Sequence, residues 1–138
     1  MTEVRLTEDL ATCLEIRRVV FTLEQGVSEA DEVDGKDPEA VHFLALEKGQ
    51  PIGTARVLMS EAIGKIGRVA VLKAARGTGA GQALIRAAVD EIARRGGREA
   101  VLGSQVSAIG FYEKLGFAAR GPEFMDAGIP HREMVRSL

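Results

Sequence analysis

Polar and apolar residues alternate along this chain with two periods, and the two periods separate predicted strands from predicted helices. The strand period of two, or a short run rich in β-branched residues, covers residues 3–6, 41–47, 52–58, 66–71 and 100–102, and a last alternating run passes through residues 134 and 135. Helical spacing of apolar residues follows Thr7, begins again at Gln82 and ends at Gly96, and a shorter helix is predicted over residues 108–117. The predicted order of elements is therefore β, α, loop, β, β, β, α, β, α, β, β.

Two features of this order set the fold class, which is mixed α/β (α+β). Turn residues at 48–51 and 61–64 join three consecutive strands into an antiparallel meander. The helix that begins at Gln82 then carries the chain from the strand at 66–71 to the strand at 100–102, and such a crossover makes a parallel pair. The sequence predicts a largely antiparallel sheet with one parallel step, and at 138 residues the whole chain, 1–138, is expected to form a single domain.

Composition and charge exclude several classes of function. The net charge of −2 gives no electrostatic basis for nucleic-acid binding, and a 4% aromatic content without Trp gives no stacking platform for bases. No apolar run approaches the roughly 20 residues of a membrane span, and the N-terminus lacks a signal-peptide pattern. We therefore expect a cytoplasmic protein with no nucleic-acid or membrane partner. Two histidines and one cysteine, far apart in sequence, lack the spacing of metal ligands, so no metal is expected.

The stretch with the clearest chemistry joins the strand at 66–71 to the helix that begins at Gln82. It reads Arg-Gly-Thr-Gly-Ala-Gly over residues 76–81, and such a loop brings backbone N–H groups and a helix N-terminus to an anion. A Walker A loop requires Lys and then Ser or Thr after its last Gly, which this loop lacks, and its glycines do not have the Rossmann spacing. The loop alone leaves two interpretations open, a phosphate-binding loop and an ordinary glycine-rich turn.

A family resemblance favours the first interpretation. Arg76-x-x-Gly79-x-Gly81 resembles the coenzyme A pyrophosphate loop of the GNAT superfamily of N-acetyltransferases, and residues 111–117, FYEKLGF, resemble that superfamily's Y-x-K-x-G-F helix. Within the superfamily the chain looks most like the ElaA-like, or YjcF-like, acetyltransferases. Matches to that subgroup are scattered in order along the chain, at Arg17, Val20, Phe21, Glu24, Gln25, Asp34, His42, Arg56, Arg68, Val69, Gln105, Gly128, Ile129, Pro130, His131 and Met134. Two positions depart from the superfamily, since Lys73 replaces a frequent Pro and Gln105 replaces a frequent Asn, although the subgroup itself has Gln there.

The resemblance implies a GNAT acyl-CoA N-acyltransferase fold of six to seven strands, flanked by helices and splayed at the central parallel pair, with acetyl-CoA as cosubstrate. The backbone of Val69, Ala70 and Val71 would hold the pantetheine arm. The pyrophosphate would lie on a loop made of Arg76, Gly77, Thr78, Gly79, Ala80, Gly81 and Gln82. Tyr112 would contact the cofactor and act as the general acid for the leaving thiolate. Two other roles for Tyr112 stay open, that of a packing residue and that of a group that only orders the CoA sulfur.

The acceptor side is less determined. The resemblance places Glu24 in the loop that walls the acceptor, so Glu24 is the first candidate for the general base, while His42, His131 and a water relay stay open. The predicted pocket residues are Arg17, Glu24, Gln25, Arg56, Arg68 and Gln105. Several cations there would suit an anionic group on the acceptor, but they could equally form structural ion pairs with Glu24, Glu32 and Asp34.

The function predicted from the resemblance is acetyl transfer from acetyl-CoA to a primary amine by direct attack, without an enzyme nucleophile. The acceptor could be a small molecule or a peptide, and a homodimer is left open. Two other classes remain, namely a CoA-binding regulatory or degenerate module without turnover, and an interaction domain in which the glycine loop is only structural. Cys13 lies on the apolar face of the first predicted helix and is expected to be a core residue, not a nucleophile.

Overall fold

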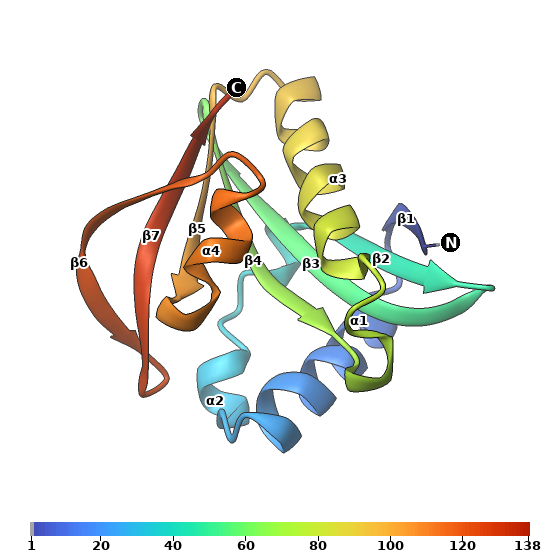
Figure 1. Ribbon diagram of the computed structural model, residues 1–138. Coiled ribbons are helices and arrows are strands. Elements are labelled where there is room, and N and C mark those ends of the chain that lie inside the picture. The colour runs from blue at the N-terminus through green and yellow to red at the C-terminus, as the bar shows by residue number, and fades with distance from the viewer. Residues whose placement is uncertain (1) are drawn as a thin grey trace.

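The computed structural model describes residues 2–138, which form a sheet of seven strands with helices on both faces (Figure 1). The strands are β1 (Thr2–Thr7), β2 (Val41–Glu47), β3 (Gln50–Ser60), β4 (Ile63–Val71), β5 (Glu99–Gln105), β6 (Ala118–Asp126) and β7 (Ile129–Ser137). The α-helices are α1 (Leu10–Arg17), α2 (Glu29–Glu32), α3 (Ala80–Arg94) and α4 (Ile109–Glu113). A π-helix, Arg18–Glu24, continues α1, and short 3₁₀ turns cover Asp37–Glu39, Lys73–Ala75 and Val106–Ala108.

The strand order confirms the topology that the hydrophobic pattern predicts. The strands lie in the order β1-β2-β3-β4-β5-β7-β6, and among the residues described the β4–β5 pair alone is parallel. The predicted order of helices and strands is also found along the chain. Most strands extend beyond their predicted ends. In β4, for example, the ladder with β3 begins at Ile63, three residues before the apolar run, because backbone pairing does not require a hydrophobic side chain.

Apolar layers hold helices to both faces of the sheet. In the layer under α3, the helix contributes the side chains of Leu84, Ile85, Ala88, Val89 and Ile92. On the opposite face, Cys13 and Ile16 of α1 pack with Leu44 of β2, whereas Phe43 of the same strand belongs to the layer under α3. This division follows from the alternation of strand side chains between the two faces. Cys13 is fully buried, and burial raises the pKa of its thiol. Its position is that of the core residue expected from the sequence.

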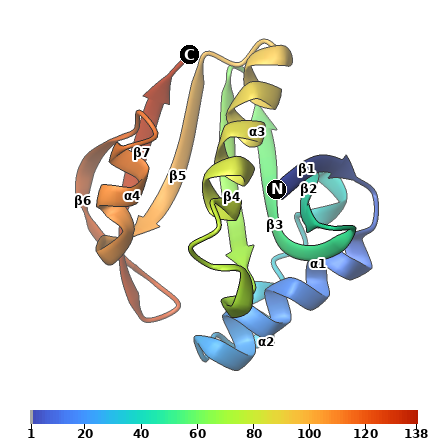
Figure 2. The same cartoon turned by 45° about the vertical axis from the view of Figure 1, so that its right-hand side comes forward.

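The parallel strands β4 and β5 diverge in the middle of the sheet. Their ladder ends at the pair Ile66–Leu102, although β4 continues to Val71 and β5 to Gln105 (Figure 2). Directly after this pair the register between β3 and β4 slips by one residue, and Arg68 takes a left-handed φ of 50°. A β-bulge of this kind bends its strand and increases the local twist. The bulge therefore turns β4 away from β5 and opens the central parallel pair.

The first helix differs from the prediction. The sequence predicts one helical face that runs from Leu10 to Phe21, but the α-helix ends at Arg17 and the next seven residues form a π-helix. The N–H of Gln25 donates to the carbonyl of Val20 at 3.2 Å, which is the wider turn of a π-helix. The wider turn shifts the residues after Arg17 out of the 3.6-residue period. As a result Phe21 is only partly buried and lines a cavity.

Candidate active site

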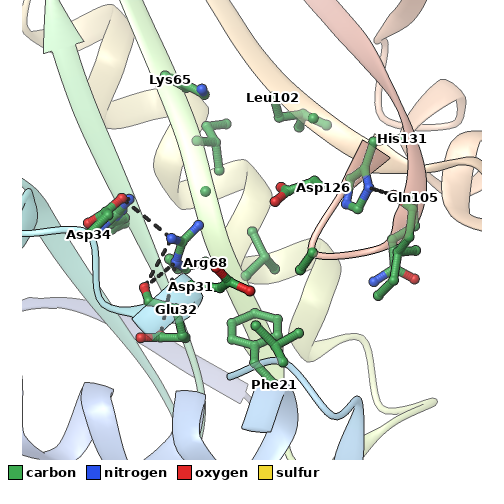
Figure 3. Close-up of a pocket in the computed structure, with 18 of the residues that line it drawn as sticks. Phe21, Asp31, Glu32, Asp34, Lys65, Arg68, Leu102, Gln105, Asp126 and His131 are labelled. Atoms are coloured by element: carbon green, nitrogen blue, oxygen red, sulfur yellow. Dashed lines mark hydrogen bonds and ion pairs between the residues drawn. The ribbon is translucent and has the colours of Figure 1, made fainter. Parts of the chain in front are cut away.

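A cavity of about 440 Å³ lies where β4 and β5 diverge. Two groups of residues line it, which we call the N-terminal wall (lining residues between Phe21 and Val69) and the C-terminal wall (lining residues between Val101 and Glu133). Figure 3 shows Arg68 and Asp34 on the N-terminal wall and His131 on the C-terminal wall. The N-terminal wall comes from the π-helix, α2 and its loop, β3 and β4, and the C-terminal wall from β5, α4 and the β6–β7 hairpin. The cavity thus collects residues that are far apart in sequence.

The glycine loop lies between β4 and α3 with the geometry of an open cradle. Gly77 and Gly79 have φ of 81° and 87°, the left-handed region that favours glycine, and Gly79 is the N-cap of α3. A Cβ atom built at either glycine would meet no heavy atom within 4 Å, so the space in front of the loop is open. The first N–H groups of a 15-residue helix lie at this end without a side-chain cap, together with the positive end of the helix dipole. These residues fit a diphosphate.

Arg76 already has partners in this structure. Its guanidinium pairs with Glu24 through Nη1–Oε2 at 2.5 Å and Nη2–Oε1 at 2.8 Å, and its Nε donates to the carbonyl of Val71 at 3.1 Å. The hydrogen bonds from Arg76 lower the pKa of Glu24. Glu24 does not line the cavity, so the structure brings it to the glycine loop and not to the predicted acceptor pocket. The prediction that Glu24 is the general base therefore has no support in this geometry.

Tyr112 of α4 lines the cavity from the side of the sheet that carries α3. Its ring packs edge-on against Phe111 at 5.0 Å and Phe117 at 6.2 Å between ring centroids. Burial raises the pKa of the Tyr112 hydroxyl above its ordinary value. A raised pKa keeps the proton on the oxygen at neutral pH, so the group can donate a proton or a hydrogen bond into the cavity.

A buried ion network lies behind the N-terminal wall. Arg17 is 1% exposed, donates to both carboxylate oxygens of Asp37 at 2.7 and 3.1 Å, and pairs through Nε with Glu32. Arg56 donates to Asp37 at 3.0 Å and forms a two-point pair with Asp34, while its Nε is buried without a partner among residues 2–138. Burial opposes the charged forms, but the hydrogen bonds prevail, because they raise the pKa of Arg17 and Arg56 and lower that of Asp37.

This network corrects one part of the predicted pocket. Arg17 does not line the cavity, because its guanidinium is enclosed by Glu32 and Asp37. Arg56 and Arg68 do line it, but both contact the carboxylate of Asp34, and the hydrogen bonds from Arg56 hold the pKa of Asp34 far below its usual range. The three arginines of the predicted pocket therefore have structural ion-pair partners, which is the second of the two interpretations left open by the sequence.

Arg68 joins the strained bulge of β4 to the loop after α2. Its Nε and Nη2 both donate to the backbone carbonyl of Glu32, at 3.1 and 3.0 Å. A left-handed φ in a residue other than Gly costs about 1–2 kcal/mol, and the fixed side chain offsets part of this cost. Arg68 thereby holds the bulge and the acceptor-side loop together.

The side-chain amides of two residues of the predicted pocket, Gln25 and Gln105, contact each other at the cavity. Gln105, at the end of β5, donates from Nε2 to Oε1 of Gln25 at 3.3 Å, and both residues line the cavity. The bond joins the segment after the π-helix to β5 across the opening between the two walls. It lies at the surface and contributes little stability, so an entering ligand can displace it at low cost.

Sequence reasoning missed several residues of the site. Asp37, the centre of the buried network, lies in an irregular acidic stretch with no periodic signal. Phe21 was expected on a buried helix face and lines the cavity because of the π-helix. Phe124 and Asp126 line the cavity from an edge strand that the hydrophobic pattern does not distinguish from its neighbour. In residues 2–138 no three potential metal-ligating side chains lie close enough to hold a metal ion, and no helix in that part of the chain is long and apolar enough to cross a membrane.

Comparisons with known proteins agree with this fold. A family model described as an acetyltransferase (GNAT) domain matches residues 20–138. The uncharacterized N-acetyltransferase YjcF of Bacillus subtilis (strain 168) is 34% identical over 130 residues, which cover 94% of this chain and 93% of YjcF. Among solved structures, Escherichia coli ElaA is 28% identical with a TM-score of 0.86, over 99% of both chains. An acyl-CoA N-acyltransferase from Pseudomonas aeruginosa is 30% identical with a TM-score of 0.85, over 99% of this chain and 98% of that one.

Proposed function

The chain belongs to the GNAT acetyltransferase family, within the group that contains ElaA and YjcF, and we propose that it transfers the acetyl group of acetyl-CoA to the nitrogen of a primary amine. The family acts by acyl transfer from acyl-CoA, and the fold is the GNAT fold. The choice of acetyl among acyl groups, and of an amine as the acceptor, is the proposal.

One observation carries the proposal, which is the open edge of β4 beside the glycine loop. Beyond Ile66 no strand of the described chain pairs with this edge on the β5 side, so its backbone can hydrogen-bond the amide groups of a pantetheine arm as a strand would. The loop of Gly77 and Gly79 at the end of the same strand offers N–H groups and open space for a diphosphate. Pantetheine and diphosphate are adjoining parts of CoA, and the two matching features adjoin in the same order.

The residues around the cavity support direct attack by the amine. Cys13, the sole cysteine, is fully buried away from the cavity, so no thiol of the chain is available to form an acyl intermediate. We propose that the backbone N–H groups near Val71 polarise the thioester carbonyl. Tyr112 would then donate its hydroxyl proton to the sulfur as the carbon–sulfur bond breaks. The raised pKa of Tyr112 supports this role because the hydroxyl stays protonated until the thiolate forms.

The residues of the two cavity walls indicate which kind of amine can be the acceptor. Because Arg56 and Arg68 already contact the carboxylate of Asp34, these two cations do not require an anionic group on the acceptor. Phe21 and Phe124 give the cavity apolar surfaces from opposite walls. We therefore propose that shape and apolar contact select the amine, with the amine nitrogen directed toward the gap between β4 and β5.

The test is turnover of acetyl-CoA with a panel of amines that differ in size, apolar character and the presence of a carboxylate or phosphate. Release of free CoA thiol would be followed together with mass spectrometry of the acceptor. The expected result is an acetylated amine and an equal amount of CoA, and the Cys13→Ala variant is expected to keep most of this activity because Cys13 is a core residue. CoA binding without turnover would favour a degenerate module, and absence of CoA binding would make the glycine loop structural.

Gly67 offers a test of where the acceptor lies. It lines the cavity on β4, and a Cβ built on it would meet no heavy atom within 4 Å. Gly67→Ala and Gly67→Val should therefore narrow the cavity stepwise without disturbing packing. We expect kcat/KM to fall with side-chain size for bulky amines and to stay within about threefold for small ones, a difference typical of a changed apolar contact. Equal losses for all amines would place the acceptor elsewhere.

A further inference from the structure

His131 occupies a distinctive position on the C-terminal wall. It lies on β7, opposite Gln105 of β5 in the ladder, and its side chain lines the cavity (Figure 3). The residue is only 9% exposed, so its ring is fixed largely by protein contacts. A buried imidazole that reaches a cavity can accept a proton there through a ring nitrogen that carries a lone pair.

The hydrogen bond of His131 determines which ring nitrogen carries the proton in the neutral state. Nδ1 lies 2.7 Å from the backbone carbonyl oxygen of Ile129. A carbonyl oxygen can only accept, so Nδ1 must be the N–H donor. In the neutral imidazole Nε2 then has no hydrogen and carries a lone pair. The geometry of the β6–β7 hairpin thus gives the ring the tautomer that a general base requires.

The free nitrogen is also held in place. Nε2 has no hydrogen-bonding partner in the described part of the chain, residues 2–138. The ring stacks on Phe124 of β6 with a centroid distance of 5.8 Å and an interplanar angle of 28°. Gly103 of β5 leaves room for Phe124, because a Cβ at Gly103 would lie 3.4 Å from the Phe124 ring. Two contacts, one hydrogen bond and one ring stack, therefore orient the Nε2 lone pair, and no group within residues 2–138 donates a hydrogen bond to it.

The other candidates for a base lack this combination. Glu24 is paired with Arg76 beside the glycine loop, outside the cavity, and the pair lowers its pKa and weakens it as a base. His42 has its Nε2 at 2.8 Å from the carbonyl oxygen of Asp37, does not line the cavity, and belongs to the buried ion network. Asp34 lines the cavity but is held ionised by Arg56, with its pKa lowered by that contact.

We propose that His131 is the general base of the acyl transfer, which rests on the proposed N-acetyltransferase function. Nε2 takes one proton from the acceptor ammonium and leaves an amine with a lone pair. The lone pair forms the carbon–nitrogen bond at the thioester carbon, and the carbon–sulfur bond breaks with its electron pair on sulfur. The sulfur takes the proton of Tyr112. The second proton lost by nitrogen restores Tyr112 through solvent, and the proton on His131 is released, so that one proton is liberated per amide formed.

Other ionisable groups near His131 could also make the reaction rate depend on pH. The ionisable side chains that share the cavity with His131 are Asp126 of β6, Glu133 of β7, Tyr112 of α4 and, from the N-terminal wall, Asp31, Glu32, Asp34, Lys36, Arg56, Lys65 and Arg68. On β5, Gln105 lies opposite His131 in the ladder, and neither it nor its neighbours Gly103 and Ser104 carries an ionisable group. None of these neighbours is an imidazole, whose ordinary pKa is the one that gives a charge change between about pH 5 and 8.

The experiment compares kcat/KM for the amine across pH in three proteins. His131→Asn keeps an N–H donor near the position of Nδ1 and removes the lone pair of Nε2. His42→Gln is the matched control, because it replaces the other histidine of the chain and keeps a donor near the position of Nε2 that faces Asp37. We expect kcat/KM of the wild type and of His42→Gln to rise through an ionisation between about pH 5 and 8. In His131→Asn that ionisation should be absent and kcat/KM at pH 7.5 about 10²-fold lower, as is usual for loss of a general base.

Two further readouts separate catalysis from structure. CoA affinity and melting temperature of His131→Asn should match the wild type. With hydroxylamine as acceptor, which is largely unprotonated at neutral pH, the loss should shrink below about tenfold, because less proton removal is needed before attack. A loss that is equal for hydroxylamine and alkylamines, or a pH profile that keeps its ionisation, would make His131 a structural residue and overturn the proposal.

If His131→Asn does not fold, a measurement on the wild type can still test the proposal. Nitrogen-15 NMR of the two histidines should show His131 as the Nδ1–H tautomer with a bare Nε2 in the neutral state. An Nε2–H tautomer would overturn the proposal. If the wild type turns over no amine at all, the proposed function itself fails and His131 fails with it. If the wild type turns over and His131→Asn equals it, only the role of His131 is lost.

Discussion

The two walls of the cavity use ionisable residues in opposite ways. Behind the N-terminal wall the buried charges are paired with one another, since Asp37 bridges Arg17 and Arg56. On the C-terminal wall the buried polar ring of His131 has one nitrogen bonded to the backbone and the other without a partner in the described chain. Tyr112, on the same wall, likewise has no hydrogen-bonding partner for its hydroxyl among residues 2–138.

The difference shows that the number of charged residues near a site is a poor guide to its chemistry. A paired buried charge holds the structure in one arrangement, because its donors and acceptors are already used. An oriented group with a free lone pair or a free proton can exchange with a ligand. The three arginines of the N-terminal wall region therefore shape the cavity, and the two polar rings of the C-terminal wall, those of Tyr112 and His131, are the groups that we propose to move protons.

The largest expected effect is on stability, from the centre of the paired network. Asp37→Asn removes the carboxylate that Arg17 and Arg56 share, and loss of one partner from a buried charge cluster typically costs about 3–5 kcal/mol. Urea unfolding would measure the loss of free energy of unfolding. Asp31→Asn is the matched control, since Asp31 is exposed and its carboxylate has no partner within residues 2–138, and it should change that free energy by less than about 0.5 kcal/mol. Similar values for the two variants would contradict the account.

Acid should weaken the same network without a mutation. The folded-state pKa values of Asp34 and Asp37 are lowered by their arginine partners, so their contribution is fully present above the unfolded pKa of about 3.9. The contribution is lost as the pH falls through the lowered folded-state values. We expect the free energy of unfolding to decline between about pH 4 and pH 2, and Arg56→Met to show a shallower decline over that range. An equal decline in the two proteins would remove the network as its cause.

A variant of the C-terminal wall should change the rate of the reaction and leave the stability of the fold unchanged. Tyr112→Phe keeps the ring contacts with Phe111 and Phe117 and removes only the hydroxyl. Because a CoA thiolate is already a fair leaving group, with a thiol pKa close to the ~8.5 of cysteine, we expect kcat to fall roughly 10–10³-fold with an unchanged melting temperature. A higher KM for acetyl-CoA with kcat spared would instead make Tyr112 a residue that positions the sulfur. Changes within about twofold in both constants would remove it from the site.

How much the sequence predicts can be judged from individual residues. The order of the strands follows from alternating runs such as 41–47, because burial of one face leaves a periodic trace, and the glycines of the loop mark backbone conformations that other residues avoid. The role of Asp37 leaves no such trace, because a bridge between two arginines depends on chain segments that meet only after folding.

The same limit applies to Glu24 and His131. Both stand in stretches with no distinctive period, and only the folded chain shows that Glu24 meets Arg76, 52 residues away, and that His131 meets the carbonyl of Ile129. The bulge at Arg68 and the π-helix after Arg17 are also departures from a regular period, so a periodic analysis cannot predict them. These departures are the features that open the cavity and place Phe21 on its wall.

The smallest expected effect in this series lies outside both walls, at the glycine loop. Gly79→Asp places a carboxylate where we propose that the pyrophosphate binds, and it puts a side chain on a residue with φ of 87°. CoA affinity should fall at least tenfold, about 1.4 kcal/mol, while both walls stay intact. Calorimetry would measure this change, and an unchanged affinity in a folded variant would move the cofactor away from this loop.

The central claim, that CoA lies along the open edge of β4 and on the glycine loop, has a direct test in the backbone amides. In a protein of 14.7 kDa, each N–H can be followed by nitrogen-15 NMR as CoA is added. The account predicts the largest chemical-shift changes at residues 69–71 and 76–82 in the wild type, and their loss in Gly79→Asp at the same CoA concentration. Changes centred on the opposite side of the sheet, around α1, or no changes at all up to millimolar CoA, would contradict it.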